Sequence, residues 1–135
     1  MTKDAARAKA VRYWWQMAEE ALQSARIAFG AGHLHTAMNR AYYAVFYAAT
    51  AALVARSLHF KRHAGVRSAL HREFIKTGLL PAEMGAAYDR LFEDRQHGDY
   101  MALSEFESDY VQEKIESAAA FLVAIQPLIP SLAEE

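Results

Sequence analysis

The sequence predicts an all-α fold, an antiparallel up-and-down bundle of four long helices plus one short helix. Apolar residues recur in several segments at the three-and-four spacing of a helix with one buried face. Glycines and prolines separate these segments, and no segment alternates apolar and polar residues as a strand does. The 135 residues fit one domain, residues 1–135 with a core over about residues 10–128, which buries roughly two thirds of its unfolded surface.

The first helix is predicted over residues 9–29, and Gly30 and Gly32 end it. Its apolar stripe passes through Trp14 and leaves Trp15 to one side. Because a large aromatic side chain outside the stripe needs cover from elsewhere, Trp15 is a candidate dimer contact.

Residues 36–53, TAMNRAYYAVFYAATAAL, are predicted to form the central helix. Alanines line one face of this segment and allow another helix to approach closely, whereas a second face carries aromatic side chains such as Tyr43 and Phe46. A helix that is apolar on nearly all sides must be buried on nearly all sides. Its single charge, Arg40, therefore needs a carboxylate, a carbonyl or a bound anion beside it.

The other boundaries follow from loop, stop and capping signals. The central helix is predicted to start within residues 33–36 and to end near residue 57, and a polar loop follows over residues 58–64. A short helix over residues 65–77 is stopped by Gly78, and the next helix runs from Pro81 to about Gln96 and is closed by Gly98. A capping box of Ser104 and Glu107 opens the last helix, which Pro127 and Pro130 end.

Charge is unevenly distributed, although the formal net charge is −1. Residues 56–76 are strongly basic and contain a single acidic residue, Glu73, whereas residues 89–116 are mostly acidic. A basic strip can bind phosphates, and an acidic one can bind a basic partner or a second copy of the chain. The alternative interpretation is two ordinary solvated surfaces.

The composition excludes several classes of site. The chain has no cysteine, which excludes disulfides, thiolate zinc sites and thiol nucleophiles. His59 and His63 are four residues apart, but Lys61 and Arg62 between them would repel a metal ion, so neither a metal nor another cofactor is predicted. Without a signal-peptide core or a membrane-spanning apolar run, the protein is expected to be soluble and cytoplasmic.

The candidate site is the run Arg95-Gln96-His97-Gly98-Asp99-Tyr100 at the end of the fourth predicted helix. Polar groups at a helix end beside a glycine can point into a groove, and Arg95 stands on the apolar face of that helix. The alternative interpretation is structural: Arg95 and Arg40 pair with Asp99 and are capped by the Tyr100 hydroxyl.

Several separated motifs, in this order, resemble the small stand-alone HEPN proteins of bacteria and archaea. They are NRAYYAVFYAATAAL, the basic loop with His63-Ala64-Gly65, FIKTGLL, and Arg95 followed by Gly98-Asp99-Tyr100. The resemblance covers residues 10–128. It implies a homodimeric helical bundle that binds RNA or nucleotide phosphate and, as in many family members, is a metal-independent endoribonuclease toxin working with a nucleotidyltransferase partner in a toxin-antitoxin system.

The family's active motif is an arginine, four to six residues, and then a histidine. Arg95 matches the arginine and would steady the charge on the scissile phosphate, but residues 100–102 hold no histidine, so His97 and His63 are the two candidate bases. The phosphate or RNA contacts implied by the resemblance are Arg40, Arg95, Lys61, Arg62, Arg67 and Tyr100, with Asp99, Asn39 and Tyr43 supporting the site. A non-catalytic helical module that docks a protein partner is the alternative function.

Overall fold

The computed structural model describes the backbone of residues 2–100 and 106–133, and the side chains of these residues except 97–100, 131 and 133. The described residues form helices joined by short connections and contain no strand, so the predicted all-α fold is confirmed. The elements are α1 (Lys3–Gly30), α2 (Leu34–Ala55), α3 (His63–Leu70), the π-helix η1 (His71–Ile75), α4 (Ala82–Tyr100), α5 (Ser108–Ile125), the 3₁₀-helix η2 (Gln126–Leu128) and α6 (Pro130–Ala133).

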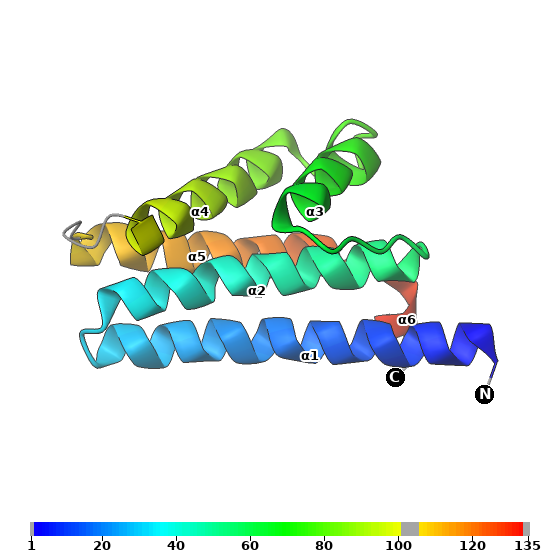
Figure 1. Ribbon diagram of the computed structural model, residues 1–135, viewed down its shortest axis with the longest axis horizontal. Coiled ribbons are helices and arrows are strands. Elements are labelled where there is room, and N and C mark those ends of the chain that lie inside the picture. Colours follow the sequence, from blue (N-terminus) through cyan, green and yellow to red (C-terminus); the bar gives the residue numbers. More distant parts are fainter. Residues whose placement is uncertain (1, 101–105, 134–135) are drawn as a thin grey trace.

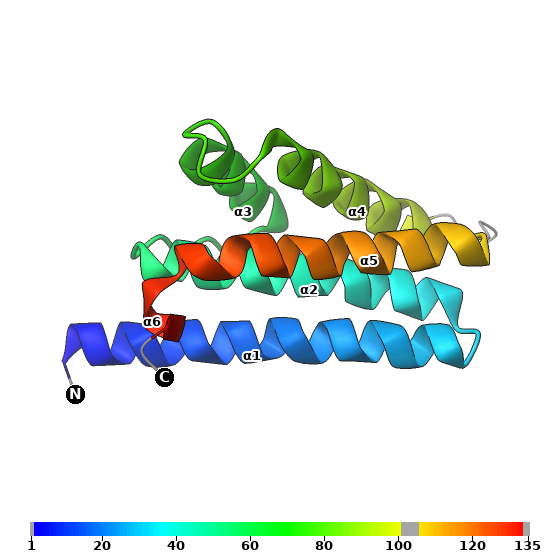
Figure 2. The same ribbon diagram turned by 180° about the vertical axis from the view of Figure 1, so that it is seen from behind.

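The long helices alternate in direction (Figure 1). Helices α1 and α4 run one way, whereas α2 and α5 run the other, and α3 and α4 form an inclined layer over α2 and α5. Figure 2 shows α5 crossing in front of α2, and α6 returning to lie beside the N-terminal part of α1. None of the helices among the described residues is long and apolar enough to span a membrane.

Helix α2 is the centre of the bundle, as its composition predicts. It packs against α1, α3, α4 and α5. Its alanines at positions 37, 41, 44, 48 and 52 are at most 1 % exposed, because a side chain no larger than a methyl group lets neighbouring helices approach closely. Gly32, with φ +80°, lies in the turn that leads from α1 into this helix, a conformation that favours glycine.

Trp15 is a core residue, so its prediction as a dimer contact is wrong. Its side chain is 6 % exposed and continues the buried face of α1 that runs through Val11 and Ala18. Trp14 is instead only half-buried and lies against Tyr47, with the ring centroids 5.7 Å apart. The predicted stripe is confirmed at Ala18, Ala21, Ala25 and Ala28, and it differs near its start, where Trp15 rather than Trp14 is buried.

Two predicted boundaries near the candidate site are wrong. Helix α4 continues to Tyr100, so Gly98 does not close it and the chain does not turn there. Helix α5 begins at Ser108 with Glu107 as its N-cap, and no side chain caps it. The predicted capping box therefore does not open this helix; its first residue, Ser104, lies outside the described residues.

The short third helix also differs from its prediction. It begins at His63, inside the predicted loop, and changes at His71 into one turn of π-helix. This turn packs against α4 at Gly85, where an added Cβ would lie 2.8 Å from His71 Cε1. A π-turn is rare and shifts the side chains that follow it around the helix axis. The prediction of one regular helix over residues 65–77 therefore does not hold at this turn.

Candidate functional site

His63, the first residue of α3, lies against the aromatic face of α2. Its imidazole stacks on Phe46 with the ring centroids 4.1 Å apart and the planes at 13°. The centroid of Tyr42 is 5.7 Å away in a second stacked arrangement, and Tyr43 meets the imidazole edge-on at 5.6 Å. Three side chains of one helix therefore surround the imidazole and set its orientation.

Arg95 reaches the same rings from α4. Its guanidinium carbon lies 5.4 Å from the centroid of Tyr42 and 5.6 Å from that of Tyr43, within the range of a cation–π contact. Burial and, second, the positive charge of Arg95 lower the pKa of His63 below its ordinary value. The structure thus brings Arg95 and His63 together and favours an uncharged imidazole at neutral pH.

Tyr42 makes the polar contact with this imidazole. Its hydroxyl oxygen lies 2.8 Å from His63 Nδ1, whereas Nε2 has no hydrogen-bond partner among the described residues. Burial raises the pKa of Tyr42 to about 12, against smaller opposing effects from Tyr88 and Arg95. The Tyr42 hydroxyl therefore keeps its proton throughout the physiological pH range.

Behind Tyr42 lies a second buried tyrosine, Tyr88 of α4. Both tyrosines are 0 % exposed. Burial raises the pKa of Tyr88 well above its ordinary value, and the two hydroxyls are near enough for each to change the pKa of the other. No described group meets full hydrogen-bond geometry with the Tyr88 hydroxyl. Tyr42 and Tyr88 are not among the site residues predicted from the sequence, where their one signal is a tyrosine in an alanine-rich segment.

Arg40 lies at the outer edge of this cluster. Its Nε and Nη2 donate to Asn39 Oδ1 at 3.1 and 3.0 Å, and its guanidinium carbon lies 4.9 Å from the centroid of Tyr43. The side chain is half-buried, so the expectation that it needs a carboxylate, a carbonyl or an anion is met in part by the Asn39 amide oxygen. Arg40, Arg95 and His63 all contact the Tyr43 ring.

The rest of the predicted basic strip does not join this cluster. Lys61 and Arg62 are exposed in the connection before α3. Arg67 lies 4.5 Å from the centroid of Phe92, and its Nε is 3.7 Å from Asp89 Oδ1. The basic and acidic stretches, predicted as two separate surfaces, thus pair with each other at this point.

Three predicted site residues at the end of α4 lie outside the part of the chain whose side chains are described: His97, Asp99 and Tyr100. The roles assigned to them stay predictions, and so does the pairing of Arg95 with Asp99.

Arg67 also borders a polar groove between α3, η1 and α4 that the sequence analysis did not predict. The groove has a volume of about 470 Å³. On its wall, His71 Nε2 lies 3.0 Å from Asp89 Oδ1. It is lined by Arg67, Ser68, His71, Arg72, Lys76 and Asp89. Among the described residues, no three histidines and carboxylates are grouped closely enough to hold a metal ion.

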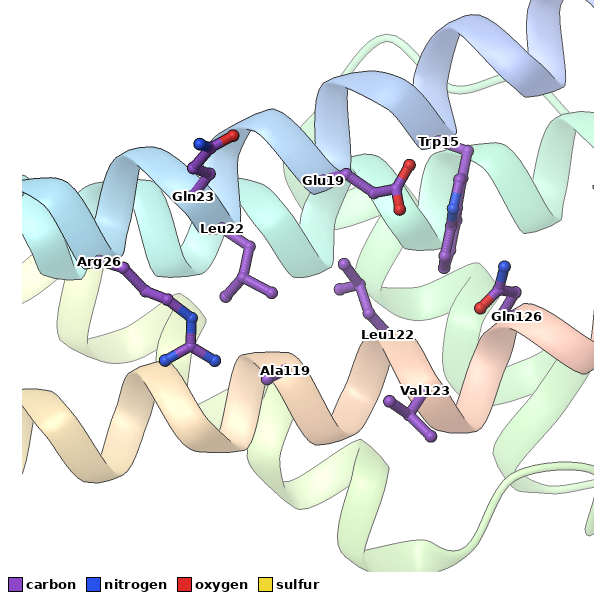
Figure 3. Close-up of a pocket in the computed structure, with 9 residues that line it drawn as sticks. All are labelled: Trp15, Glu19, Leu22, Gln23, Arg26, Ala119, Leu122, Val123 and Gln126. Carbon is purple, nitrogen blue, oxygen red and sulfur yellow. The ribbon is translucent and has the colours of Figure 1, made fainter.

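A second groove, of about 440 Å³ and mostly apolar, lies between α1 and α5 (Figure 3). Trp15, Leu22 and Leu122 point into it, and the polar side chains of Glu19, Gln23, Arg26 and Gln126 surround it. Arg26 Nη1 lies 2.6 Å from Glu116 Oε1, in an exposed ion pair that links the two helices. This groove contains no cluster of groups suited to catalysis.

Comparisons with known proteins place these features in context. The family model of the HEPN domain matches residues 11–127. A UPF0332 protein of Thermotoga maritima is 45 % identical over 124 residues, covering 92 % of this chain and 94 % of the relative. Two proteins of Methanocaldococcus jannaschii are similar. "Putative toxin MJ0142" is 28 % identical over 79 % of this chain and 73 % of its own length, and "Putative toxin MJ0605" is 34 % identical over 63 % of each chain.

Proposed function

This chain belongs to the HEPN domain family, and on that premise we propose that it is a toxin-like protein that binds a phosphate of RNA or of a nucleotide beside Arg95 and His63. The observation that carries the proposal is the contact of both side chains with the same two rings, Tyr42 and Tyr43. A guanidinium and an imidazole N–H are both strong hydrogen-bond donors to phosphate oxygens. Arg40, on the edge of the Tyr43 ring, adds a further positive charge nearby.

The catalytic form of the proposal is a metal-independent endoribonuclease. A base takes the proton of the ribose 2′-hydroxyl, the resulting oxygen attacks the adjacent phosphorus to form a 2′,3′-cyclic phosphate, and the bond to the 5′-oxygen breaks as that oxygen takes up a proton from an acid or from water. Arg95 would stabilise the negative charge that develops on the phosphate oxygens. His63 and His97 are the two candidate bases, and the lowered pKa of His63 supports an uncharged imidazole at neutral pH.

The proposed setting is a cytoplasmic toxin-antitoxin system in which a homodimer of this chain works with a nucleotidyltransferase partner. Two relatives named as putative toxins support the toxin part. Membership of the HEPN family is the support for the homodimer and for the nucleotidyltransferase partner.

An RNA-cleavage assay in the presence of a metal chelator tests the catalytic form. Wild type should cleave single-stranded RNA, and Arg95→Ala should slow cleavage by roughly 100-fold or more, the usual effect of removing one group that stabilises the transition state. Arg26→Ala is the matched control, because it removes an exposed arginine that pairs with Glu116 of α5. Equal rates for wild type and Arg95→Ala would remove Arg95 from the mechanism.

The alternative function is a non-catalytic module that docks a protein partner. The apolar groove between α1 and α5, with Val123 at its edge 73 % exposed, favours this alternative, because exposed apolar surface is typical of interaction sites. If this is the function, Arg95→Ala should lower the melting temperature while RNA binding, measured by fluorescence anisotropy, is absent from wild type and variant alike.

A further inference from the structure

We propose that Tyr42 is a positioning residue that holds His63 in the tautomer with its proton on Nε2. In this arrangement the Tyr42 hydroxyl donates to Nδ1, and Nε2–H is the one imidazole donor that a ligand can reach. The second part of the inference rests on the proposed function: Nε2–H donates to a phosphate oxygen beside Arg95. His63 is then a phosphate-binding residue rather than a base, so that His97 is the one left of the two candidate bases for a cleavage step.

The hydrogen of the Tyr42 hydroxyl needs an acceptor inside the protein. This hydroxyl is fully buried and keeps its proton. Among the described residues, the acceptor within hydrogen-bond distance is His63 Nδ1, at 2.8 Å. A buried O–H without an acceptor loses its hydration and gains nothing in return. Donation from Tyr42 to Nδ1 avoids this cost.

The hydrogen of the Tyr88 hydroxyl points to the same tautomer. If Tyr42 donates to Nδ1, its oxygen lone pairs face the neighbouring Tyr88 hydroxyl, which lies close enough to affect the pKa of Tyr42 although it falls short of full hydrogen-bond geometry. In the opposite arrangement Nδ1–H donates to Tyr42, the Tyr42 hydrogen has only the Tyr88 oxygen to face, and no described residue is left to accept the Tyr88 hydrogen. The number of satisfied donors therefore favours the Nε2–H tautomer.

The surroundings of the imidazole oppose its protonation. The charged and titratable groups around it in the described part of the chain are Arg95 from α4, Tyr42 and Tyr43 from α2, Arg40 beyond the Tyr43 ring and, behind them, Arg67, Tyr88 and Asp89. The positive charge of Arg95 opposes a second positive charge on His63. The stack on Phe46 at 4.1 Å holds the ring in place, so the neutral imidazole keeps a fixed orientation.

Nitrogen-15 NMR of histidine-labelled protein tests the tautomer without any RNA. In wild type at pH 7.5, the His63 signals should show a protonated Nε2 and an unprotonated Nδ1 that accepts a hydrogen bond. In Tyr42→Phe, which keeps the ring and removes only the hydroxyl, the Nδ1 signal should lose that hydrogen bond. Tyr110→Phe is the control, because it removes another hydrogen-bonded hydroxyl, between Arg90 and Asp94, and should leave His63 unchanged. A protonated Nδ1 in wild type would overturn the proposal.

Binding of a single-stranded RNA with 2′-O-methyl groups, which cannot be cleaved by attack of the 2′-oxygen, tests the second part. Tyr42→Phe and His63→Ala should each weaken binding roughly 3- to 10-fold, the usual value of one hydrogen bond. The double variant should bind no more weakly than His63→Ala, because Tyr42 acts through His63. Additive losses would overturn the positioning role. If wild type does not bind this RNA, the RNA form of the proposed function fails, and the NMR result still decides the tautomer.

Discussion

His63 shows how the surroundings of one side chain decide its charge. A histidine beside Lys61 and Arg62 in a basic loop would be expected to titrate as an exposed group. The structure instead places it at the start of α3, stacked on Phe46 and near Arg95, where burial and positive charge both oppose its protonation.

The lowered pKa of His63 predicts how stability depends on pH. In the unfolded chain this histidine has its ordinary pKa of about 6.5, so below pH 6.5 the unfolded state binds more protons than the folded state. The free energy of unfolding should therefore fall as pH drops from 6.5 toward the lower folded pKa, and it should be unaffected by this group above pH 7.5.

The prediction is checked by urea unfolding at pH 7.5 and pH 5.5 for wild type and His63→Gln. Wild type should lose more stability than the variant between these two pH values, because the variant lacks the titrating imidazole while the other histidines are present in both. Equal losses would show that the pKa of His63 is not lowered in the folded protein.

The π-helix η1 shows how packing between two elements overrides local propensity. Residues 65–77 have the pattern of one regular helix, yet one turn widens at His71, where the helix meets α4. Gly85 provides the space on the α4 side, since an added Cβ would lie 2.8 Å from His71 Cε1 and 3.2 Å from Ile75 Cγ1.

Gly85→Ala should therefore destabilise the protein, although alanine forms helix better than glycine. Overpacking of a buried contact costs about 1–3 kcal/mol, and the gain in helix propensity is about 1 kcal/mol, so a net loss of about 1 kcal/mol is expected in urea unfolding. Gly30→Ala is the matched control, because nothing lies within 4 Å of its added Cβ, and its stability should be unchanged or slightly raised. Greater stability of Gly85→Ala would contradict the close contact with His71.

In the described part of the chain, the bundle leaves apolar surface partly uncovered in at least two places. One is the apolar groove between α1 and α5. The other is an aromatic strip over α1 and α2 in which Tyr13 is 55 % exposed and Trp14, Tyr43, Phe46 and Tyr47 are half-buried. The strip is contiguous with Arg95 through the Tyr43 ring, so we expect the proposed homodimer to form there, with the two copies of Arg95 near each other.

Sedimentation equilibrium should accordingly give a mass of twice 15.2 kDa. Tyr47→Glu, which places a charge in the aromatic strip, should shift the protein toward monomer, whereas Val123→Glu at the groove should leave the dimer intact. Circular dichroism of each variant checks that it is folded. A monomeric wild type at micromolar concentration would contradict the dimer, and dissociation by Val123→Glu alone would move the interface to the groove.

The sequence by itself determined the fold class, the central place of α2 and the approximate positions of the helices, because helical periodicity, glycine stops and an alanine-rich segment are local signals. It was less accurate where an element depends on its neighbours. The burial of Trp15 and the π-turn at His71 depend on packing against other helices, and at Gly98 the glycine is a misleading stop signal, because α4 continues to Tyr100.

The sequence also selected Arg95, His63 and Tyr43, but it did not show that they meet, nor that Tyr42 and Tyr88 lie behind them. These residues come from α2, α3 and α4, and only the packing of α3 and α4 on α2 brings them around one imidazole. Burial and the nearby guanidinium then set the pKa of His63. Such effects depend on distances between segments remote in the sequence, and for that physical reason the tertiary structure alone decided them.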